Sequence, residues 1–284
     1  MDIIESAGEL RARLHDARMA GARIGLVPTM GYLHEGHVSL FRQAVLQCDL
    51  VVASLFVNPL QFGPSEDFAV YPRRPEADAR IAANASVDVL FMPSTEEMYP
   101  QPPVVSLTLQ GIHDHLCGRS RPGHFEGVAT VVAKLFNLVQ PHVAYFGQKD
   151  AQQLAVVRRL VRDLNYAIEV IGCPIVRDVD GLALSSRNVY LSDLERPQAA
   201  VLRRSLLLAE QLVSQGETDV QELLRQVREV IGSAALATID YVEVVDPDTL
   251  TPLTRLAGSG LLALAVFFGR TRLIDNTLLC VPTP

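Results

Sequence analysis

The sequence lacks the features that would mark a secreted, membrane-bound or zinc-ribbon protein. Its four cysteines, Cys48, Cys117, Cys173 and Cys280, are widely scattered and form no C-x-x-C pair, which disfavours a zinc ribbon and favours a reducing compartment. The start, MDIIESAGEL, has neither the basic residues nor the apolar core of a signal peptide. The most apolar tract, 261–268, is far shorter than the ~20 residues of a membrane-spanning helix. We expect a soluble cytoplasmic protein with no membrane partner.

An excess of basic residues is also missing. The 284 residues include 25 Lys and Arg against 32 Asp and Glu, which gives a formal net charge of −7. Because no global positive field favours a polyanion, nucleic acid is not an expected partner. An acidic protein can still bind a nucleotide, since a phosphate site needs only a few local cations and backbone N–H groups.

Short apolar runs alternate with amphipathic stretches through the first part of the chain, where hydrophobic periodicity changes repeatedly. The expected strands are 24–27, 50–57, 87–92, 143–146 and 167–171, and the expected helices are 35–47, 127–139 and 151–164. This alternation predicts an α/β fold, a Rossmann-like doubly wound parallel sheet over 1–177. Right-handed crossovers place the loops that follow the strands along one edge, where the chemistry is expected.

The regular alternation of expected strands and helices ends near Asp178. The later expected elements are helices at 194–215 and 218–233, strands at 239–245 and 261–268, and a hairpin at 270–272. We therefore predict a smaller α+β C-terminal domain over 178–284.

Two histidines in the stretch PTMGYLHEGH, residues 28–37, raise the first question of function. Zinc is disfavoured, because His34 and His37 are three residues apart, whereas the H-E-x-x-H motif spaces them by four and a third ligand is missing. Two exposed histidines on a helix's first turn are the bland alternative. The context favours an anion site: a strand, a loop with Gly31 and Gly36, and a helix start whose N–H groups and dipole attract phosphate.

The common phosphate motifs, G-x-x-x-x-G-K-[ST] and a strand-following G-x-G-x-x-G, are absent. The H-x-G-H pattern resembles the nucleotidylyltransferase superfamily, in which such histidines are associated with attack at the α-phosphate of ATP. By itself this pattern does not exclude that the two histidines are ordinary exposed residues.

Three further polar segments sit at strand ends or near the domain junction. Asn58 and Gln61 in FVNPLQFG suit hydroxyl and carboxylate groups, although Asn before Pro is also ordinary turn punctuation. In FGQKDAQQ, Lys149 is expected in the first turn of a helix, where a cation is unfavourable unless an anion compensates. LSSRN, residues 184–188, suits a polyphosphate or is simply a polar linker.

The segments H-x-G-H, F-V-N-P-x-Q-F, F-G-x-K-D-x-Q-Q and S-S-R-N occur in this order between 25 and 191. Together with Tyr71-Pro72-Arg73 and His124-Phe125-Glu126-Gly127, they closely resemble the pantothenate synthetase (pantoate–β-alanine ligase) family. Two positions depart from the family pattern: Leu184 replaces a methionine, and Gln148 replaces an acidic residue before Lys149. The first keeps an apolar contact, whereas the second removes a charge near the site.

The resemblance implies an ATP-dependent, AMP-forming ligase. Pantoate's carboxylate would attack the α-phosphate of Mg·ATP to give pantoyl adenylate and pyrophosphate, and the amine of β-alanine would then displace AMP. The resemblance also implies ATP as substrate, Mg²⁺, a homodimer, and a C-terminal domain that closes over ATP. The alternatives are another nucleotidylyltransferase, a tRNA synthetase, which the acidic charge disfavours, or a non-catalytic nucleotide sensor.

The resemblance also implies roles for individual residues. His34, His37 and Lys149 would be catalytic, with His37 as the proton donor, and Asn58, Gln61 and Gln153 would bind pantoate or β-alanine. The residues expected to bind ATP are Pro28, Thr29, Met30, Gly31, Tyr32, Leu33, His34, Glu35, Gly36, His37, Gly147, Gln148, Lys149, Asp150, Val176, Leu184, Ser185, Ser186 and Arg187. Within this set, Asp150 would hold the ribose, the backbone of Val176 the adenine, and Ser185 to Arg187 the polyphosphate. The metal ligands are not predicted.

Overall fold

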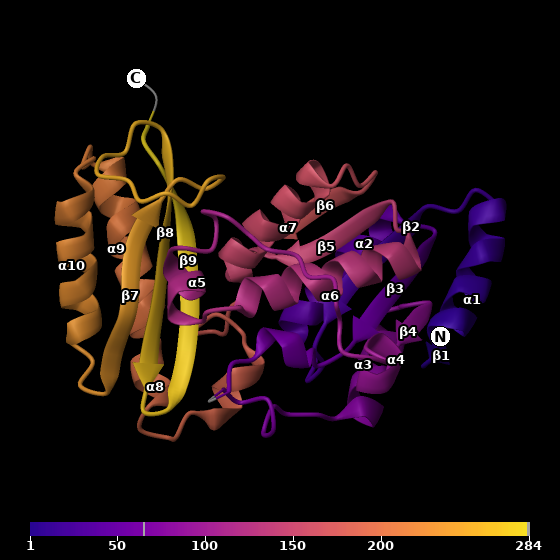
Figure 1. Cartoon of the computed structure of the whole chain (residues 1–284). Helices are drawn as coiled ribbons and strands as arrows, with labels where there is room; N and C mark the ends of the chain where they lie inside the picture. Colours follow the sequence, from indigo (N-terminus) through magenta and orange to yellow (C-terminus); the bar gives the residue numbers. More distant parts are fainter. Residues whose placement is uncertain (65, 283–284) are drawn as a thin grey trace. The chain divides into compact units, whose positions relative to one another are not determined.

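The computed structural model describes residues 1–64 and 66–282 and contains two compact units (Figure 1). Unit 1 consists of Met1–Leu109, Arg121–Gln148 and Val156–Pro174. Unit 2 consists of Gln110–Ser120, Lys149–Ala155 and the described residues from Ile175 onward. The division at residues 177 and 178 stays a prediction.

Unit 1 is built on a parallel sheet, as the strand–helix alternation predicts. The six strands lie in the order β1-β4-β3-β2-β5-β6, and every neighbouring pair is parallel. Their bounds are β1 (Asp2–Ile4), β2 (Ile24–Thr29), β3 (Leu50–Leu55), β4 (Val89–Phe91), β5 (Val143–Gly147) and β6 (Glu169–Cys173). The central strands are almost fully buried, which explains their continuous apolar runs.

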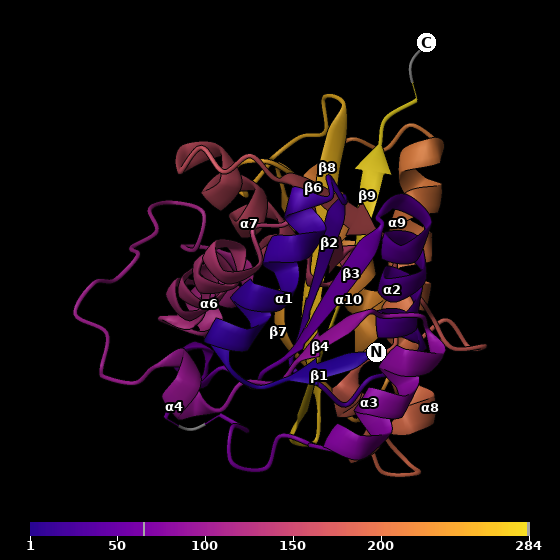
Figure 2. The same ribbon diagram turned by 90° about the vertical axis from the view of Figure 1, so that its right-hand side faces the viewer.

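Helices cover both faces of this sheet. Helices α1 and α6 contact each other on one face, and α2 and α3 contact each other on the opposite face (Figure 2). The helices with residues in unit 1 are α1 (Ala7–Met19), α2 (Glu35–Gln47), α3 (Pro75–Asn84), α4 (Thr95–Met98), α6 (His124–Val139) and α7 (Ala151–Asp163). The short 3₁₀ turn η1 (Pro59–Gln61) follows β3 and packs on α6.

The order of the strands creates a topological switch point. From β2 the chain continues to β3 and β4 on one side, whereas β5 and β6 lie on the other side of β2. In a doubly wound sheet, ligands bind outside the carboxyl ends of the strands at such a point. The loop after β2, which carries the two histidines, therefore begins at the edge where a nucleotide is expected.

Unit 2 contains a three-stranded antiparallel sheet in the order β7-β8-β9, formed by β7 (Ala237–Val245), β8 (Ser259–Phe268) and β9 (Thr271–Cys280). A tight turn at Gly269 and Arg270 joins the last two strands, which agrees with the expected hairpin; Gly269 has a φ of 56°, which suits glycine. Helices α9 (Val201–Ser214) and α10 (Val220–Gly232) pack on this sheet, while α5 (Leu116–Ser120) also contacts it. The 3₁₀ turns η2 (Gln148–Asp150) and η3 (Ser186–Tyr190) complete the elements relevant to the site.

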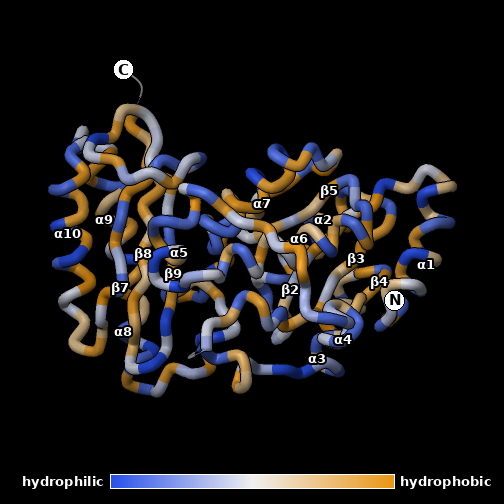
Figure 3. Tube along the Cα trace, viewed as in Figure 1, coloured by the Kyte–Doolittle hydropathy of each residue, from blue (hydrophilic) through white to orange (hydrophobic). Residues whose placement is uncertain are grey.

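The helix expected at 194–215 is interrupted in the structure. A short helix α8 (Arg196–Ala199) precedes α9, because Ala200 has a ψ of −14° that departs from regular α-helical geometry. Apolar side chains of α9, α10 and the three strands form one buried core. Figure 3 shows how strongly β8 is hydrophobic, as expected for the middle strand of a covered sheet.

Candidate functional site

The loop between β2 and α2 is held by a buried carboxylate. Gly31 and Tyr32 have positive φ values of 90° and 52°, so the N–H groups of Tyr32 and Leu33 point the same way. Both donate to Asp78 on α3, at 2.8 Å each, and the Asp78 residue is only 1% exposed. Asp78 thereby fixes the loop that leads into the histidine pair.

His34 and His37 bond reciprocally at the start of α2. His34 is the N-cap, and its Nδ1 accepts from Gly36 N–H at 3.1 Å; Nδ1 of His37 accepts from His34 N–H at 3.3 Å. The two ring centroids are 4.1 Å apart. A neutral imidazole that accepts at Nδ1 carries its proton on Nε2, so both rings present an Nε2–H donor. The expected position at the beginning of a helix is confirmed.

Among residues 1–64 and 66–282, no group of three or more His, Cys, Asp and Glu side chains could hold a metal ion. A helix N-terminus with two imidazole donors is instead suited to an anion, because the positive end of the dipole and both donors act on the same negative charge.

Asn58 and Gln61 come together beside Met30 in unit 1. The Asn58 amide nitrogen donates to Gly127 O at 3.0 Å and to Gln61 Oε1 at 3.3 Å. The Gln61 amide nitrogen in turn lies 2.8 Å from Met30 Sδ. The structure therefore brings two of the predicted acid-binding residues next to Met30 of the predicted ATP-binding loop.

Tyr99 determines how the Asn58 amide is oriented. Its hydroxyl donates to Asn58 Oδ1 at 2.9 Å, which leaves the amide nitrogen turned toward Gln61. Burial raises the pKa of Tyr99 well above its ordinary value, so the phenol stays a neutral donor. Asn58 is 1% exposed, and both its amide oxygen and its amide nitrogen form hydrogen bonds. Asn58 therefore helps to orient the Gln61 side chain within unit 1.

The H-F-E-G segment supports the same turn from α6. A Cβ on Gly127 would lie 2.2 Å from Leu60 O, so only glycine lets α6 approach η1 this closely. His124 Nδ1 donates to Gln61 O at 2.8 Å, and Arg121 donates to the same oxygen at 3.3 Å. This explains the segment as a support for Gln61.

Arg121 is itself held by an ion pair with Glu66. Partial burial opposes ionisation of Glu66, but hydrogen bonds and charge attraction from Arg121 outweigh it and keep the pKa of Glu66 below its usual value. The pair therefore helps to fix the guanidinium behind the carbonyl of Gln61.

Gly147 ends β5 in unit 1, next to Gln148, the position that departs from the family pattern. The Gln148 side-chain nitrogen donates to Gly172 O of β6 at 3.3 Å. A glutamate there could not donate this bond, so the amide gives the position a local structural contact.

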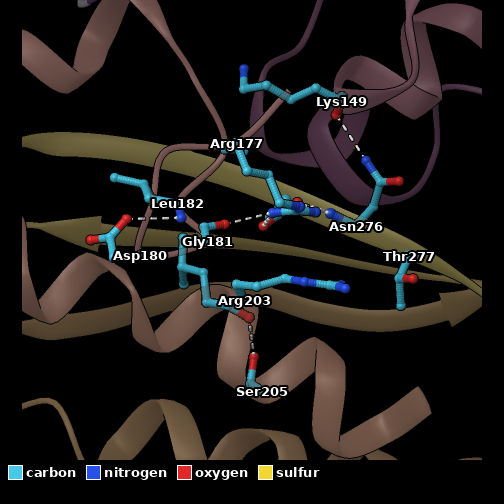
Figure 4. A network of polar contacts seen from close by, with 12 residues as sticks. Lys149, Arg177, Asp180, Gly181, Leu182, Arg203, Ser205, Asn276 and Thr277 are labelled. Carbon is cyan, nitrogen blue, oxygen red and sulfur yellow. Dashed lines mark hydrogen bonds and ion pairs between the residues drawn. The ribbon is translucent and has the colours of Figure 1, made fainter. Parts of the chain in front are cut away.

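Lys149 lies in a different local structure from the one expected. It belongs to the 3₁₀ turn η2, and α7 begins only at Ala151, so Lys149 is not in the first turn of an α-helix. Its Nζ lies 3.9 Å from Asp150 Oδ2, and its main-chain oxygen accepts from Asn276 of β9 at 2.9 Å (Figure 4). Gln153 follows on α7 and is partly exposed.

A short hairpin carries the remaining predicted residues in unit 2. Leu184 N–H donates to Val176 O at 2.9 Å, and Arg177 and Ala183 form a bridge beside them. The chain then enters η3, where Ser185 is the N-cap and accepts from Arg187 N–H at 3.3 Å. The hairpin thus orders the Ser185–Arg187 segment at the start of a turn.

Four contributing residues were missed by sequence reasoning: Asp78, Tyr99, Asp275 and Asn276. Each is an unremarkable residue type in its own element, and each acts on a segment more than 40 positions away. A single sequence carries no signal for such pairings.

A doubly wound parallel sheet whose switch point carries H-x-G-H at a helix N-terminus is typical of a nucleotide-binding α/β protein. Comparison with known proteins narrows this class. The model of the family described as pantoate-beta-alanine ligase matches residues 2–278. This chain belongs to that family.

Individual relatives agree over nearly the whole length. The pantothenate synthetase of Heliobacterium modesticaldum is 56% identical over 276 residues, covering 97% of this chain and 98% of that protein. The crystal structure of pantothenate synthetase from Thermus thermophilus is similar with a TM-score of 0.93 and 48% identity, covering 98% of this chain and 99% of that one. The ligase from Francisella tularensis, solved with β,γ-ATP and β-alanine, has a TM-score of 0.81 and 33% identity over 98% and 97% of the two chains. The expected fold is confirmed.

Proposed function

We propose that the chain joins pantoate to β-alanine at the expense of ATP, forming pantothenate, AMP and pyrophosphate. The observation that carries the proposal is the pair of imidazoles at the N-terminus of α2, with Asp78 holding the preceding loop. Family membership over residues 2–278 supports the same reaction.

The reaction proceeds in two displacements. A pantoate carboxylate oxygen forms a bond to the α-phosphorus of ATP as the bond to pyrophosphate breaks. The amine nitrogen of β-alanine then bonds to the acyl carbon as AMP leaves, and the amine gives up a proton. Adenylation is required because a carboxylate is a poor electrophile, whereas AMP is a good leaving group.

In this proposal the residues of unit 1 act on both reactants. His34 and His37 donate from Nε2 to phosphate oxygens, with His37 as the proton donor, and so stabilise charge that develops during adenylation. The segment from Pro28 to His37, together with Gly147 and Gln148, forms the nucleotide wall. Gln61, held by Asn58, binds pantoate and also contacts β-alanine.

The proposal also assigns roles to residues of unit 2. Lys149 neutralises charge near the α-phosphate, Asp150 holds the ribose, and the backbone at Val176 contacts adenine. Leu184, Ser185, Ser186 and Arg187 bind the polyphosphate, and Gln153 binds pantoate. Mg²⁺ would be brought with ATP and would reduce the negative charge on its phosphates.

Pantoate-dependent exchange of labelled pyrophosphate into ATP tests the proposal, because it reports adenylation alone. We expect exchange in the absence of β-alanine and pantothenate formation after its addition. Exchange with a phosphorylated acceptor instead of pantoate would indicate another nucleotidylyltransferase, and ATP binding without exchange would indicate a sensor. We also propose that the protein is a homodimer, and sedimentation should then give the mass of two chains.

Substitutions connect the exchange to the site. His34→Ala or Lys149→Ala should lower the adenylation rate by about 100-fold or more, as for loss of one preorganised donor. The exposed His15 on α1 provides the control, since His15→Ala removes an imidazole at no proposed site. Turnover near that of the unsubstituted protein would remove the substituted residue from the mechanism.

A further inference from the structure

The edge strand β9 holds two segments of unit 2 that the proposed function assigns to ATP. Among the described strands it pairs with β8 alone, so its other edge is available to the rest of the unit. Asp275 and Asn276 are adjacent on this strand and are 2% and 7% exposed, respectively. Buried polar residues side by side on an edge strand need partners, and both have them.

Asp275 clamps the base of the hairpin that leads to Ser185. Its two carboxylate oxygens accept from the two terminal nitrogens of Arg177, at 2.6 and 2.9 Å, in a bidentate pair. The Asp275 side chain is fully buried and that of Arg177 is 19% exposed. The same guanidinium donates to Gly181 O at 3.0 Å, across the hairpin turn (Figure 4).

The next residue on the strand holds Lys149. Asn276 Nδ2 donates to the main-chain oxygen of Lys149 at 2.9 Å, and the two residues face each other in Figure 4. The main-chain N–H of Asn276 also donates to Asp275 Oδ1 at 2.8 Å, which links the two anchors directly. Neighbouring strand residues project to opposite faces, so one dipeptide can reach two segments.

We propose that Asp275 and Asn276 are positioning residues for adenylation: β9 fixes Lys149 and, through Arg177, the hairpin before Ser185–Arg187 in one shared register. The proposal rests on the proposed function, because it assumes that both segments handle the phosphates of ATP. Neither Asp275 nor Asn276 is assigned a contact with substrate. Their effect is on the positions of the Lys149 ammonium group and of the Ser185 and Ser186 hydroxyl groups. Misplacement of such groups by about 1 Å can lower the rate about 100-fold.

Asn276→Ala tests the first anchor, because it removes the bond to Lys149 O and leaves the Lys149 side chain present. We expect pantoate-dependent pyrophosphate exchange to fall about 10- to 100-fold, with ATP KM raised and pantoate KM unchanged. Asn276→Asp should be worse than Asn276→Ala, since a carboxylate cannot donate and repels the carbonyl oxygen.

Arg177 provides a graded test of the second anchor. Arg177→Lys keeps a charge for Asp275 without the bidentate geometry, and Arg177→Met removes the charge, so the loss of exchange should increase in that order. Thr277→Ala lies on the same strand but removes only a bond to Glu210, and it should exchange like the unsubstituted protein.

A second ion pair in unit 2 serves as a control that distinguishes a loss of positioning from a general loss of stability. Arg272 binds Asp240 elsewhere in unit 2 and its side chain, 18% exposed, is as buried as that of Arg177. Arg272→Met and Arg177→Met should both lower the unfolding midpoint, but only Arg177→Met should raise the KM for ATP.

The outcomes are distinct. Equal exchange kinetics in Arg177→Met and Arg272→Met, or exchange by Asn276→Ala at the unsubstituted rate, would overturn the positioning role while leaving the proposed function intact. No pantoate-dependent exchange in the unsubstituted protein would overturn the proposed function first.

Discussion

Replacing Asp78 should loosen the histidine loop of unit 1 and slow adenylation together. The carboxylate accepts two backbone N–H groups, from Tyr32 and Leu33, and the residue is almost completely buried. A hydrogen bond to a charged group contributes about 1.5–3 kcal/mol, so two such bonds set an upper range of about 3–6 kcal/mol. The cost of burying the charge offsets part of this sum.

The two informative substitutions at Asp78 differ in what they leave behind. Asp78→Asn keeps one acceptor oxygen but turns an amide NH₂ toward the other N–H, so we expect a loss of about 2–3 kcal/mol in the free energy of unfolding. Asp78→Ala leaves both N–H groups without the carboxylate and should cost about 3–5 kcal/mol. Because His34 directly follows the held loop, pyrophosphate exchange should fall at least about 10-fold in both.

Urea unfolding followed by circular dichroism measures the first effect, and exchange at a temperature where each variant is folded measures the second. Asp88→Asn is the matched control, since Asp88 accepts one backbone N–H, from Val51 at 2.7 Å, in the same unit. It should lose about 1–2 kcal/mol and keep its exchange rate. If Asp78→Asn also keeps its exchange rate per folded molecule, the loop does not depend on the carboxylate and the reasoning is wrong.

Three further predictions concern the residues around Gln61. Tyr99→Phe removes one hydrogen bond to Asn58 and should lower the free energy of unfolding by about 1 kcal/mol. It should also raise the KM for pantoate more than the KM for ATP, and equal changes in both KM values would contradict this. Gly127→Ala forces a Cβ against Leu60 O and should cost about 1–3 kcal/mol, measured by urea unfolding, with a loss of pantoate affinity; an unchanged midpoint would mean that α6 can shift without cost. The lowered pKa of Glu66 means that its stabilising effect is present above the unfolded value of 4.5 and is lost as pH falls through the lower folded value. As the pH is lowered below 4.5, the urea unfolding midpoint should therefore fall more steeply in the unsubstituted protein than in Glu66→Gln. Parallel curves would exclude the Glu66–Arg121 pair as the cause.

The elements that the sequence predicts well are those with one dominant physical cause. The strand at 50–55 is buried along almost its whole length, so its apolar run is unbroken. Helix α1 was not expected, because only Leu10 and Leu14 are buried along 13 residues and the apolar stripe is too sparse. Strand β1 has only three residues, too few for any periodicity.

The sequence likewise predicts some residues of the candidate site and not others. Polar side chains at strand ends identify the loop with His34 and the turn with Asn58 and Gln61, because topology alone collects the carboxyl ends of parallel strands. The prediction that Lys149 lies in the first turn of an α-helix was wrong. The sequence around Lys149 does not distinguish such a turn from the 3₁₀ turn η2 that the structure contains. Asp78 in a helix that begins with Pro75 has the pattern of an ordinary acidic first turn, and only the fold shows what it accepts.

Three of the supporting residues share a mode of action that explains why the proposed reaction needs them. Asp78 binds the main chain before the histidines, His124 binds the carbonyl of Gln61, and Asn276 binds the carbonyl of Lys149. Main-chain anchors fix where a residue stands without using the end of its side chain, which is the part that meets a substrate. Stabilisation of developing charge depends on donors that need not reorganise during the reaction. The proposed reaction, which needs no covalent enzyme intermediate, would rely on such placement. Loss of an anchor should therefore reduce the rate even though every proposed substrate-binding group is still present.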